Sequence, residues 1–160
     1  MEMSSAGLLA ALDIFTGHFP EDAAVTAPFR HFAESFDGAD LFDRKNFTGH
    51  ITVSAVVASP GMDMFLLLGH RQLKKWLQPG GHVEASDPDF IAGAVREVGE
   101  ETGLPRDSYD IMALPDGFPG IDFDSHYIPP SDSNGEGEHF YNHVRFLVRL
   151  QRDPPTEVET

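Results

Sequence analysis

The chain has 160 residues, 41% of them hydrophobic and none of them cysteine, and its formal net charge at pH 7 is −15. The lack of cysteine excludes disulfide bonds, zinc–thiolate sites and cysteine nucleophiles. The acidic charge disfavours nucleic acids and anionic membranes as partners, and no apolar run approaches the roughly 20 residues that span a bilayer. We therefore expect one cytoplasmic domain whose N-terminus is mature protein without a secretory signal.

The first part of the chain is expected to form a helical extension. Residues 4–16 have helical spacing after a serine cap, and residues 21–36 are a second helical candidate that Pro28 should break or kink. The sequence DGAD at 37–40 then indicates a turn. We expect this extension, residues 1–48, to pack on the following domain or to contribute to a homodimer, and not to enter a membrane.

The remainder of the chain has strand patterns on both sides of one central helix. β-Branched residues predict a strand at 50–59, and a PGMD turn leads to a second, more buried strand at 64–71, so the two should form a hairpin. Further strands are expected at 76–84 (interrupted by a Pro-Gly-Gly turn), 109–114, 121–128 and 139–150. An acidic loop at 131–138 and a flexible tail at 151–160 complete a mixed α/β or α+β chain.

The central helix is expected to reach about Thr102. Asp87 is a suitable N-cap, Pro88 suits the first helical position, and Gly103 suits the position that ends a helix. Near its end, where the helix dipole favours cations, the sequence instead has three carboxylates: Glu97, Glu100 and Glu101.

The three glutamates also border the apolar face of this helix. At about 100° per residue, Glu100 and Glu101 lie within about 60° of Glu97, beside the apolar stripe and not opposite it. Glu97 and Glu101 repel each other, and Gly93 and Gly99 each weaken the helix by about 1 kcal/mol. A bound Mg²⁺ would remove the repulsion, and Gly93 would leave space for a loop or ligand. An ordinary acidic helix exposed to solvent is the alternative that the geometry leaves open.

The segment GGHVEASDPDFIAGAVREVGEETGL, residues 80–104, resembles the Nudix box. Gly81 opens the pattern, and its second half is matched completely by Arg96, Glu97, Val98, Glu100, Glu101, Gly103 and Leu104. Asp87 stands where the pattern has its first glutamate, with eight residues before Arg96 instead of seven. This difference leaves open whether Asp87 binds metal or only caps the helix.

Three further segments resemble a subset of Nudix proteins that has a helical N-terminal extension. They are GHITVSA (49–55), HRQLKKWLQPGGH (70–82) and VRFL (144–147). The final strand departs from that subset, because Tyr141 stands at the place of a histidine and His143 at the place of an acid. A contribution of this strand to metal binding is therefore not implied.

The resemblance implies a Nudix fold, an α/β/α sandwich around a mixed β-sheet, at residues 49–150, with the N-terminal helices added to it. It implies hydrolysis of a phosphoanhydride bond in a nucleoside diphosphate linked to another moiety X, with Mg²⁺ or Mn²⁺ as cofactor. Glu97, Glu100 and Glu101 would be the metal ligands and, with Arg96, the catalytic residues. Arg96 would orient the glutamates, although an ordinary ion pair within the helix is the alternative.

Other positions are weaker candidates for the same site. The candidates for a distal metal ligand or base are Glu136, Glu138 and His139, for which a solvated loop or a satisfied imidazole is the alternative. The candidates for substrate binding are Gly80, Gly81, His82, Arg71 and Lys74; a plain turn would also explain the glycines and the basic residues. Trp76 would either stack on a base or belong to the core.

Three functions are therefore compared. A metal-dependent Nudix hydrolase accounts for the complete glutamate set. A Nudix-fold sensor that binds a nucleotide-type ligand without turnover is the alternative, favoured by the shifted Asp87 and the altered final strand. An acidic scaffold domain would leave the three glutamates at the end of the helix unexplained.

Overall fold

The computed structural model describes residues 1–71, 74–130, 135 and 137–153. These residues contain the helices α1 (Ser5–His18), α2 (Ala23–Ser35) and α3 (Phe90–Thr102), with 3₁₀ turns at Pro20–Asp22, Gly38–Leu41 and Arg106–Ser108. The strands are β1 (His50–Ala58), β2 (Phe65–Leu66), β3 (Leu68–His70), β4 (Lys75–Leu77), β5 (Gly80–His82), β6 (Tyr109–Ile111), β7 (Gly120–Ile128) and β8 (His139–Leu150). The predicted mixed α/β class with N-terminal helices is confirmed.

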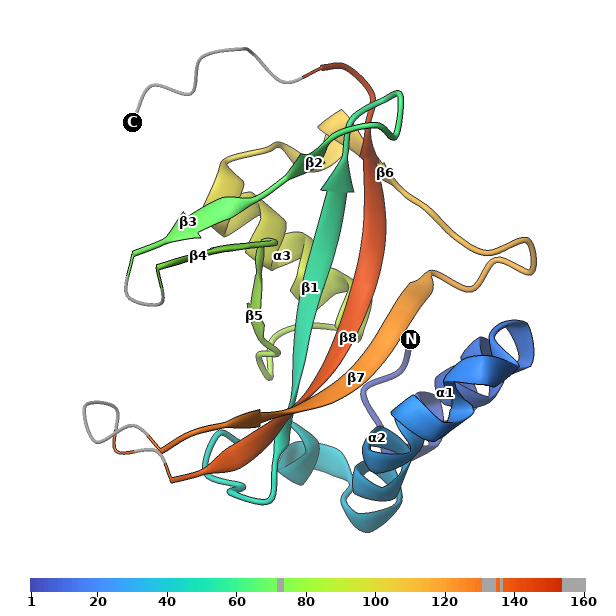
Figure 1. The fold of residues 1–160 in the computed structure, drawn as a ribbon, viewed down its shortest axis with the longest axis vertical. Helices are drawn as coiled ribbons and strands as arrows, with labels where there is room; N and C mark the ends of the chain where they lie inside the picture. The colour runs from blue at the N-terminus through green and yellow to red at the C-terminus, as the bar shows by residue number, and fades with distance from the viewer. Residues whose placement is uncertain (72–73, 131–134, 136, 154–160) are drawn as a thin grey trace.

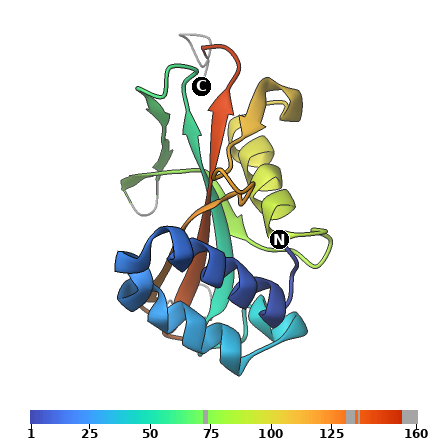
Figure 2. The ribbon, with the colours of Figure 1, turned by 90° about the vertical axis from the view of Figure 1, so that its right-hand side faces the viewer.

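β1 and β8 are neighbours in the mixed sheet and run parallel, whereas the other pairings are antiparallel (Figure 1). β2 and β5 both pair with β1, and β6 and β7 both pair with β8. β3 and β4 form a separate two-stranded ribbon. In Figure 2, this ribbon and α3 lie on opposite sides of β1 and β8.

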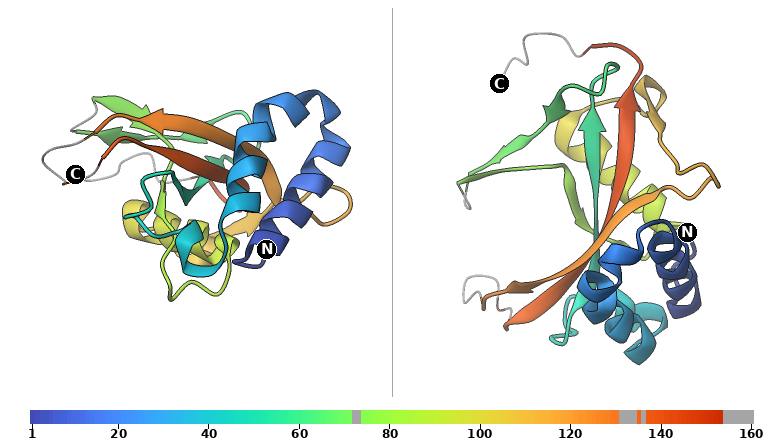
Figure 3. Two further views of the ribbon diagram at one scale, coloured as in Figure 1. Left: turned by 90° about the horizontal axis from the view of Figure 1, so that it is seen from below. Right: turned by 45° about the vertical axis from the view of Figure 1, so that its right-hand side comes forward.

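The N-terminal helices lie side by side and cover β7 (Figure 3). Their buried aromatic side chains meet the sheet directly, since the rings of Phe15 and Phe29 contact the ring of Phe123 with centroids 5.2 and 5.4 Å apart. The same hydrophobic cluster includes Phe90 of α3 and Ile51 of β1. The N-terminal helices therefore share a core with the sheet and with the start of α3, while a second cluster, which includes Val98 and Tyr109, packs elsewhere between α3 and the sheet.

Both N-terminal helices were predicted, and of the two effects expected at Pro28, a break or a kink, the break does not occur. Ser4 caps α1 by accepting a hydrogen bond from the Gly7 N–H, while α2 continues through Pro28. Phe29 and Phe32 are buried on the next turn, and burying two phenylalanines contributes about 3–6 kcal/mol. This offsets the roughly 3 kcal/mol that a proline costs inside a helix.

The strand expected at 64–71 is not the buried partner of β1. Only two of its residues pair with β1, and the chain then leaves the main sheet to form β3. As part of an edge strand, Phe65 is 56% exposed, so the expectation of a more buried strand is wrong. Trp76, on the projecting ribbon, is 72% exposed, and the alternative that it belongs to the core is also wrong.

α3 begins two residues later than predicted. Asp89 caps it by accepting a hydrogen bond from the Ala92 N–H at 2.8 Å, so the prediction of Asp87 as N-cap and Pro88 as first helical residue is wrong. The end is as predicted: Gly103 follows Thr102 with a left-handed φ of 70°, a conformation that glycine adopts without strain.

The predicted strands at the C-terminal end are present, although β6 stops at Ile111. Leu114 instead belongs to a turn, where its N–H donates to the Phe118 carbonyl. The predicted acidic loop and tail lie largely outside the described residues. Among the described helices, none combines the length and the apolar composition that crossing a bilayer requires.

The packing of α2 on the sheet generates a stability prediction. We infer that the helical extension 1–48 and the domain 49–150 unfold as one unit. Phe29→Ala should then lower the free energy of unfolding by about 4 kcal/mol, because it removes a fully buried ring from the shared core. Urea unfolding followed by circular dichroism measures this change. Val25→Ala, at an exposed position of the same helix, should change it by less than about 0.5 kcal/mol; equal effects would contradict the inference.

Candidate active site

The three glutamates predicted as metal ligands lie on the last two turns of α3, beside the short strand β5. Glu101 accepts a hydrogen bond from the Gly80 N–H at 2.9 Å. A Cβ atom on Gly81 would lie 2.5 Å from the Glu97 carboxylate, closer than real side chains approach one another. The strand backbone therefore touches the carboxylates directly, and any side chain at position 81 would displace the Glu97 carboxylate.

Gly80 is constrained from the other side of the strand. It pairs with Ser54 of β1, and a Cβ atom at Gly80 would collide with the Ser54 side chain and the Val53 carbonyl. Close packing against β1 thus requires glycine at position 80, while Gly81 leaves room for the Glu97 carboxylate. The two glycines together allow β5 to lie between β1 and α3.

Arg96 links the carboxylates to the preceding loop. Its Nε and Nη2 donate to the two carboxylate oxygens of Asp87, each at 3.1 Å, and Nη2 also donates to the His82 carbonyl at 2.8 Å. Its Nη1 donates to Glu97 at 2.9 Å and to Glu100 at 3.2 Å. Arg96 therefore holds two of the predicted metal ligands while Asp87 holds Arg96.

Asp87 is an ion-pair partner in this structure, with a side chain that is only 5% exposed. Burial alone would raise the pKa of Asp87, but the hydrogen bonds from Arg96 and from the Glu84 N–H outweigh it and lower the pKa. Gly93 makes room for this carboxylate, since a Cβ atom at Gly93 would lie 3.0 Å from it. The space that the sequence predicted at Gly93 is thus filled by the loop.

The environment of Glu97 is unfavourable for a negative charge. Burial raises the pKa of Glu97, and repulsion from Glu101 and Glu100 adds to this effect, against the opposing hydrogen bond and charge of Arg96. The three carboxylates are therefore close enough to destabilise one another. This is the electrostatic situation that a nearby cation relieves.

A divalent metal ion fits this set in its chemistry. Mg²⁺ and Mn²⁺ prefer oxygen ligands, and carboxylates supply them. In the described part of the chain, however, no group of three or more potential ligand side chains already has the geometry to hold an ion. Because Arg96 occupies one face of both Glu97 and Glu100, metal binding would require these side chains to reorient.

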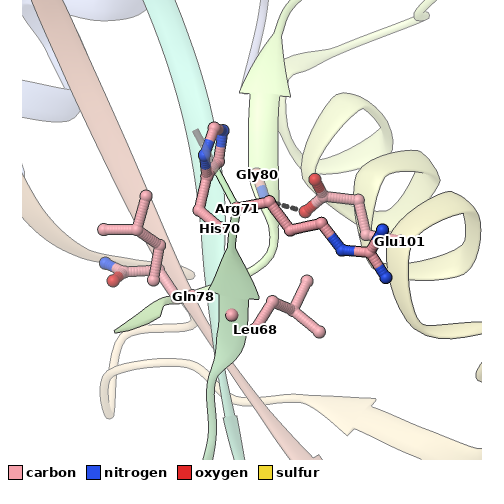
Figure 4. A pocket seen from close by; sticks show the side chains of 8 residues that line it. Leu68, His70, Arg71, Gln78, Gly80 and Glu101 are labelled. Atoms are coloured by element: carbon pink, nitrogen blue, oxygen red, sulfur yellow. Dashed lines mark hydrogen bonds between the residues drawn. The ribbon is translucent and has the colours of Figure 1, made fainter. Parts of the chain in front are cut away.

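A pocket of about 410 Å³ opens beside Glu101, between α3 and the β3–β4 ribbon (Figure 4). Arg71 lies across it, and its side chain extends towards the side where Glu101 stands. Gly80 and Gln78 also line this pocket. The structure thus brings two of the predicted substrate-binding residues, Arg71 and Gly80, to the glutamate site. Lys74 is on the same ribbon, in a turn with a positive φ of 51°, and does not line the pocket.

His82 points to the other face of the sheet, where both its ring nitrogens have partners. Nδ1 lies 3.0 Å from the Arg44 guanidinium and Nε2 lies 3.1 Å from the His50 ring. Burial, with Arg44 and His50 adding to it, lowers the pKa of His82 to about 3. The ring is therefore neutral near pH 7, and binding a substrate would require it to exchange these partners.

The distal candidates from the last strand do not join the glutamate site. Glu138 accepts a hydrogen bond from the Tyr127 hydroxyl at 2.8 Å. His139 is 2% exposed and stacks on His50 with ring centroids 4.9 Å apart. Glu136 lies outside the described residues. None of the described contacts links Glu138 or His139 to α3.

The sequence analysis missed two residues that shape this region. His50 was given no role, yet its buried ring lies between those of His82 and His139. Alternation along β1 could have indicated this position, because Ile51 and Val53 face the core and place His50 on the opposite face. Arg44 precedes β1 in an irregular segment, and no periodic signal points to it.

The sequence of residues 48–159 matches the family model of the NUDIX domain. The match covers more than half of the chain and includes β5, α3 and the three glutamates, and the chain therefore belongs to the Nudix family of hydrolases. Its Nudix fold is the one that the sequence predicted.

Several solved structures are similar to the chain over about two thirds of its length. The Ap4A hydrolase of C. elegans has 19% identity and a TM-score of 0.39 over 68% of this chain and 72% of that chain. A NUDIX hydrolase from Nitrosomonas europaea has 24% identity and a TM-score of 0.41 over 69% of this chain and 65% of that chain. A NUDIX-family hydrolase from Clostridium perfringens has 22% identity and a TM-score of 0.45 over 69% of this chain and 76% of that chain. The curated proteins gave no significant match.

The bond between Arg96 and Asp87 generates a prediction with a defined pH dependence. Asp87→Asn should lower the free energy of unfolding by about 2 kcal/mol at neutral pH, because it leaves a largely buried guanidinium without its charged partner. The folded-state pKa of Asp87 is lowered, so the carboxylate contributes stability above its ordinary pKa of 3.8, and this contribution is lost as the pH falls through the folded-state pKa.

Urea unfolding at neutral pH and below the ordinary carboxyl pKa measures this effect. The difference in the free energy of unfolding between the wild type and Asp87→Asn should become smaller at the lower pH. Asp107→Asn removes the same charge at an exposed position and should have little effect at either pH. A difference that stays constant between the two conditions would contradict the assigned ion pair.

Proposed function

We propose that the chain hydrolyses a phosphoanhydride bond in a nucleoside diphosphate linked to another moiety X, with Mg²⁺ or Mn²⁺. The observation that carries this proposal is the cluster of Glu97, Glu100 and Glu101 at the Gly80–Gly81 backbone, beside a pocket large enough for part of a small molecule. The family membership supports it independently.

Glu97, Glu100 and Glu101 would hold the metal ion. The ion would neutralise phosphate charge, stabilise the leaving oxygen and lower the pKa of a bound water. Glu100 and Glu101 are exposed, whereas Glu97 is partly buried beside Gly81 and would turn over a shorter range to meet the ion. One of the three would also help to activate water.

Arg96 would orient the ligands through charge-assisted hydrogen bonds. Its contacts with Asp87 and the His82 carbonyl leave Nη1 to direct Glu97 and Glu100. A guanidinium held at several points keeps its plane fixed, so the carboxylates that it contacts are held as well. The Asp87 carboxylate would thus act on the reaction through Arg96, without binding metal.

Arg71 would bind a phosphate group of the substrate. The protein has a net charge of −15 and repels anions at long range. A guanidinium within the pocket that Glu101 lines would provide local attraction at the place where the diphosphate must lie. The backbone of Gly80 and Gly81 would allow a close approach of the substrate, and Lys74, on the neighbouring turn, would add positive charge at its entrance.

A nucleotide-ligand sensor remains the second candidate function, because one observation favours it. Arg96 bridges Glu97 and Glu100 in the described structure, which is an arrangement that a binding module without turnover could retain. The glutamate set favours hydrolysis, since binding alone does not require every metal ligand. A direct assay separates the two functions.

The assignment of Glu101 is tested by Glu101→Gln. Loss of one metal-ligating carboxylate removes several kcal/mol of transition-state stabilisation, and at about 1.4 kcal/mol per tenfold change the rate should fall by about 100-fold or more. Nucleoside monophosphate formed from a panel of nucleoside diphosphate compounds with Mg²⁺ or Mn²⁺, separated by chromatography, measures the rate, and circular dichroism checks that the fold survives.

The matched control is Glu34→Gln, an exposed glutamate on α2, which should leave the rate unchanged. Unchanged turnover in Glu101→Gln would contradict the metal assignment. Saturable ligand binding by the wild type without any product would contradict hydrolysis and indicate the sensor.

A further inference from the structure

A second pocket, of about 350 Å³, lies between α2 and the strands β7 and β8. Among the described residues, none lines both this pocket and the glutamate pocket. Its walls are aromatic: the rings of Phe32 and Phe36 lie 5.0 Å apart on one side, and Phe140 of β8, 45% exposed, stands on the other. Its volume is within the range of about 300–1,000 Å³ that is typical of small-molecule sites.

Five of the described residues that line this pocket have polar side chains, among them Ser125 of β7 and Asn142 of β8. The Ser125 hydroxyl donates to Asn142 Oδ1 at 2.6 Å. Asn142 is 2% exposed, and its Nδ2 has no hydrogen-bond partner among the residues that the structure describes. Buried polar groups in native proteins are nearly always paired, so this unpaired amide donor indicates a missing acceptor. The nitrogen itself is fully buried, so an acceptor in the pocket would reach it after the Asn142 side chain turns.

The backbone around this amide is also unusual. Gly49 has a φ of +155°, and a Cβ atom there would lie 2.8 Å from Asn142 Nδ2. Pro28, inside α2, lines the same pocket although proline removes a helical hydrogen bond. Local choices that disfavour folding and converge on one place are typical of functional sites.

We propose that this pocket binds an uncharged aromatic or heteroaromatic ring that carries a hydrogen-bond acceptor, such as a carbonyl oxygen. The phenylalanine walls would stack on the ring, and the acceptor would satisfy the amide of Asn142. No lysine or arginine is among the described residues that line the pocket. His31 also lines the pocket, but the net charge of −15 disfavours an anion at this place. The site is independent of the proposed hydrolase reaction.

The test uses benzamide as the probe and the full ¹⁵N-labelled chain in NMR titrations. Benzamide should shift the resonances of Ser125, Phe140 and the Asn142 side-chain amide in a saturable manner. Toluene lacks the acceptor and benzoate carries a charge, so both should bind at least about tenfold more weakly. Shifts that are absent at these residues, or toluene binding as tightly as benzamide, would overturn the proposal.

Matched variants locate the site. Ser35→Trp places a large side chain in the pocket and should weaken benzamide binding at least about tenfold, whereas Glu34→Trp, one position away and outside the lining, should not. The Ser125→Ala, Asn142→Leu double variant keeps the shape, and a thermal melt checks its fold; its benzamide affinity should fall to that of toluene. Equal effects of the two tryptophan variants, or full affinity in the double variant, would overturn the proposal.

Discussion

Mutual repulsion among the carboxylates of Glu97, Glu100 and Glu101 is the constraint on which the rest of this site depends. Burial raises the pKa of Glu97, and the other two glutamates raise it further. Within the described residues, the positive charge that reduces this repulsion comes from Arg96, which reaches both Glu97 and Glu100. A protein selected for stability alone would not place three anions at the negative end of a helix, so their presence indicates a function that needs them.

The surrounding sequence follows from this arrangement. Arg96 donates hydrogen bonds to two glutamates through Nη1, while Asp87 and the His82 carbonyl accept hydrogen bonds from its other nitrogens. Gly93 leaves room for the Asp87 carboxylate, and Gly81 leaves room for the Glu97 carboxylate beside β5. These unfavourable local choices, which appear unrelated in the sequence, therefore support one electrostatic cluster beside a pocket.

Periodicity and end signals predicted the parts of this site that are local in the chain. The stripe of glutamates, the end of α3 at Gly103 and the long strand β8 were all correct. The wrong predictions concern side chains whose partner is far away in the sequence, or for which two nearby residues of the same type could take the same role. Asp87 and Asp89 both suit the N-cap of α3 by residue type, but Asp87 is held by Arg96, nine residues later, and Asp89 caps the helix. The partners of His82 depend on Arg44 and His50 across the sheet, which spacing cannot indicate.

The pKa of the Glu97 carboxyl, followed by NMR during a pH titration with and without Mg²⁺, tests the central claim most directly. Without the ion, the account predicts a pKa above the ordinary value, because burial and neighbouring carboxylates disfavour the charge. With saturating Mg²⁺ it predicts a pKa below the ordinary value, because a cation beside the carboxylate stabilises its ionised form. A pKa that the ion leaves unchanged would contradict the assignment of these three glutamates to a metal site.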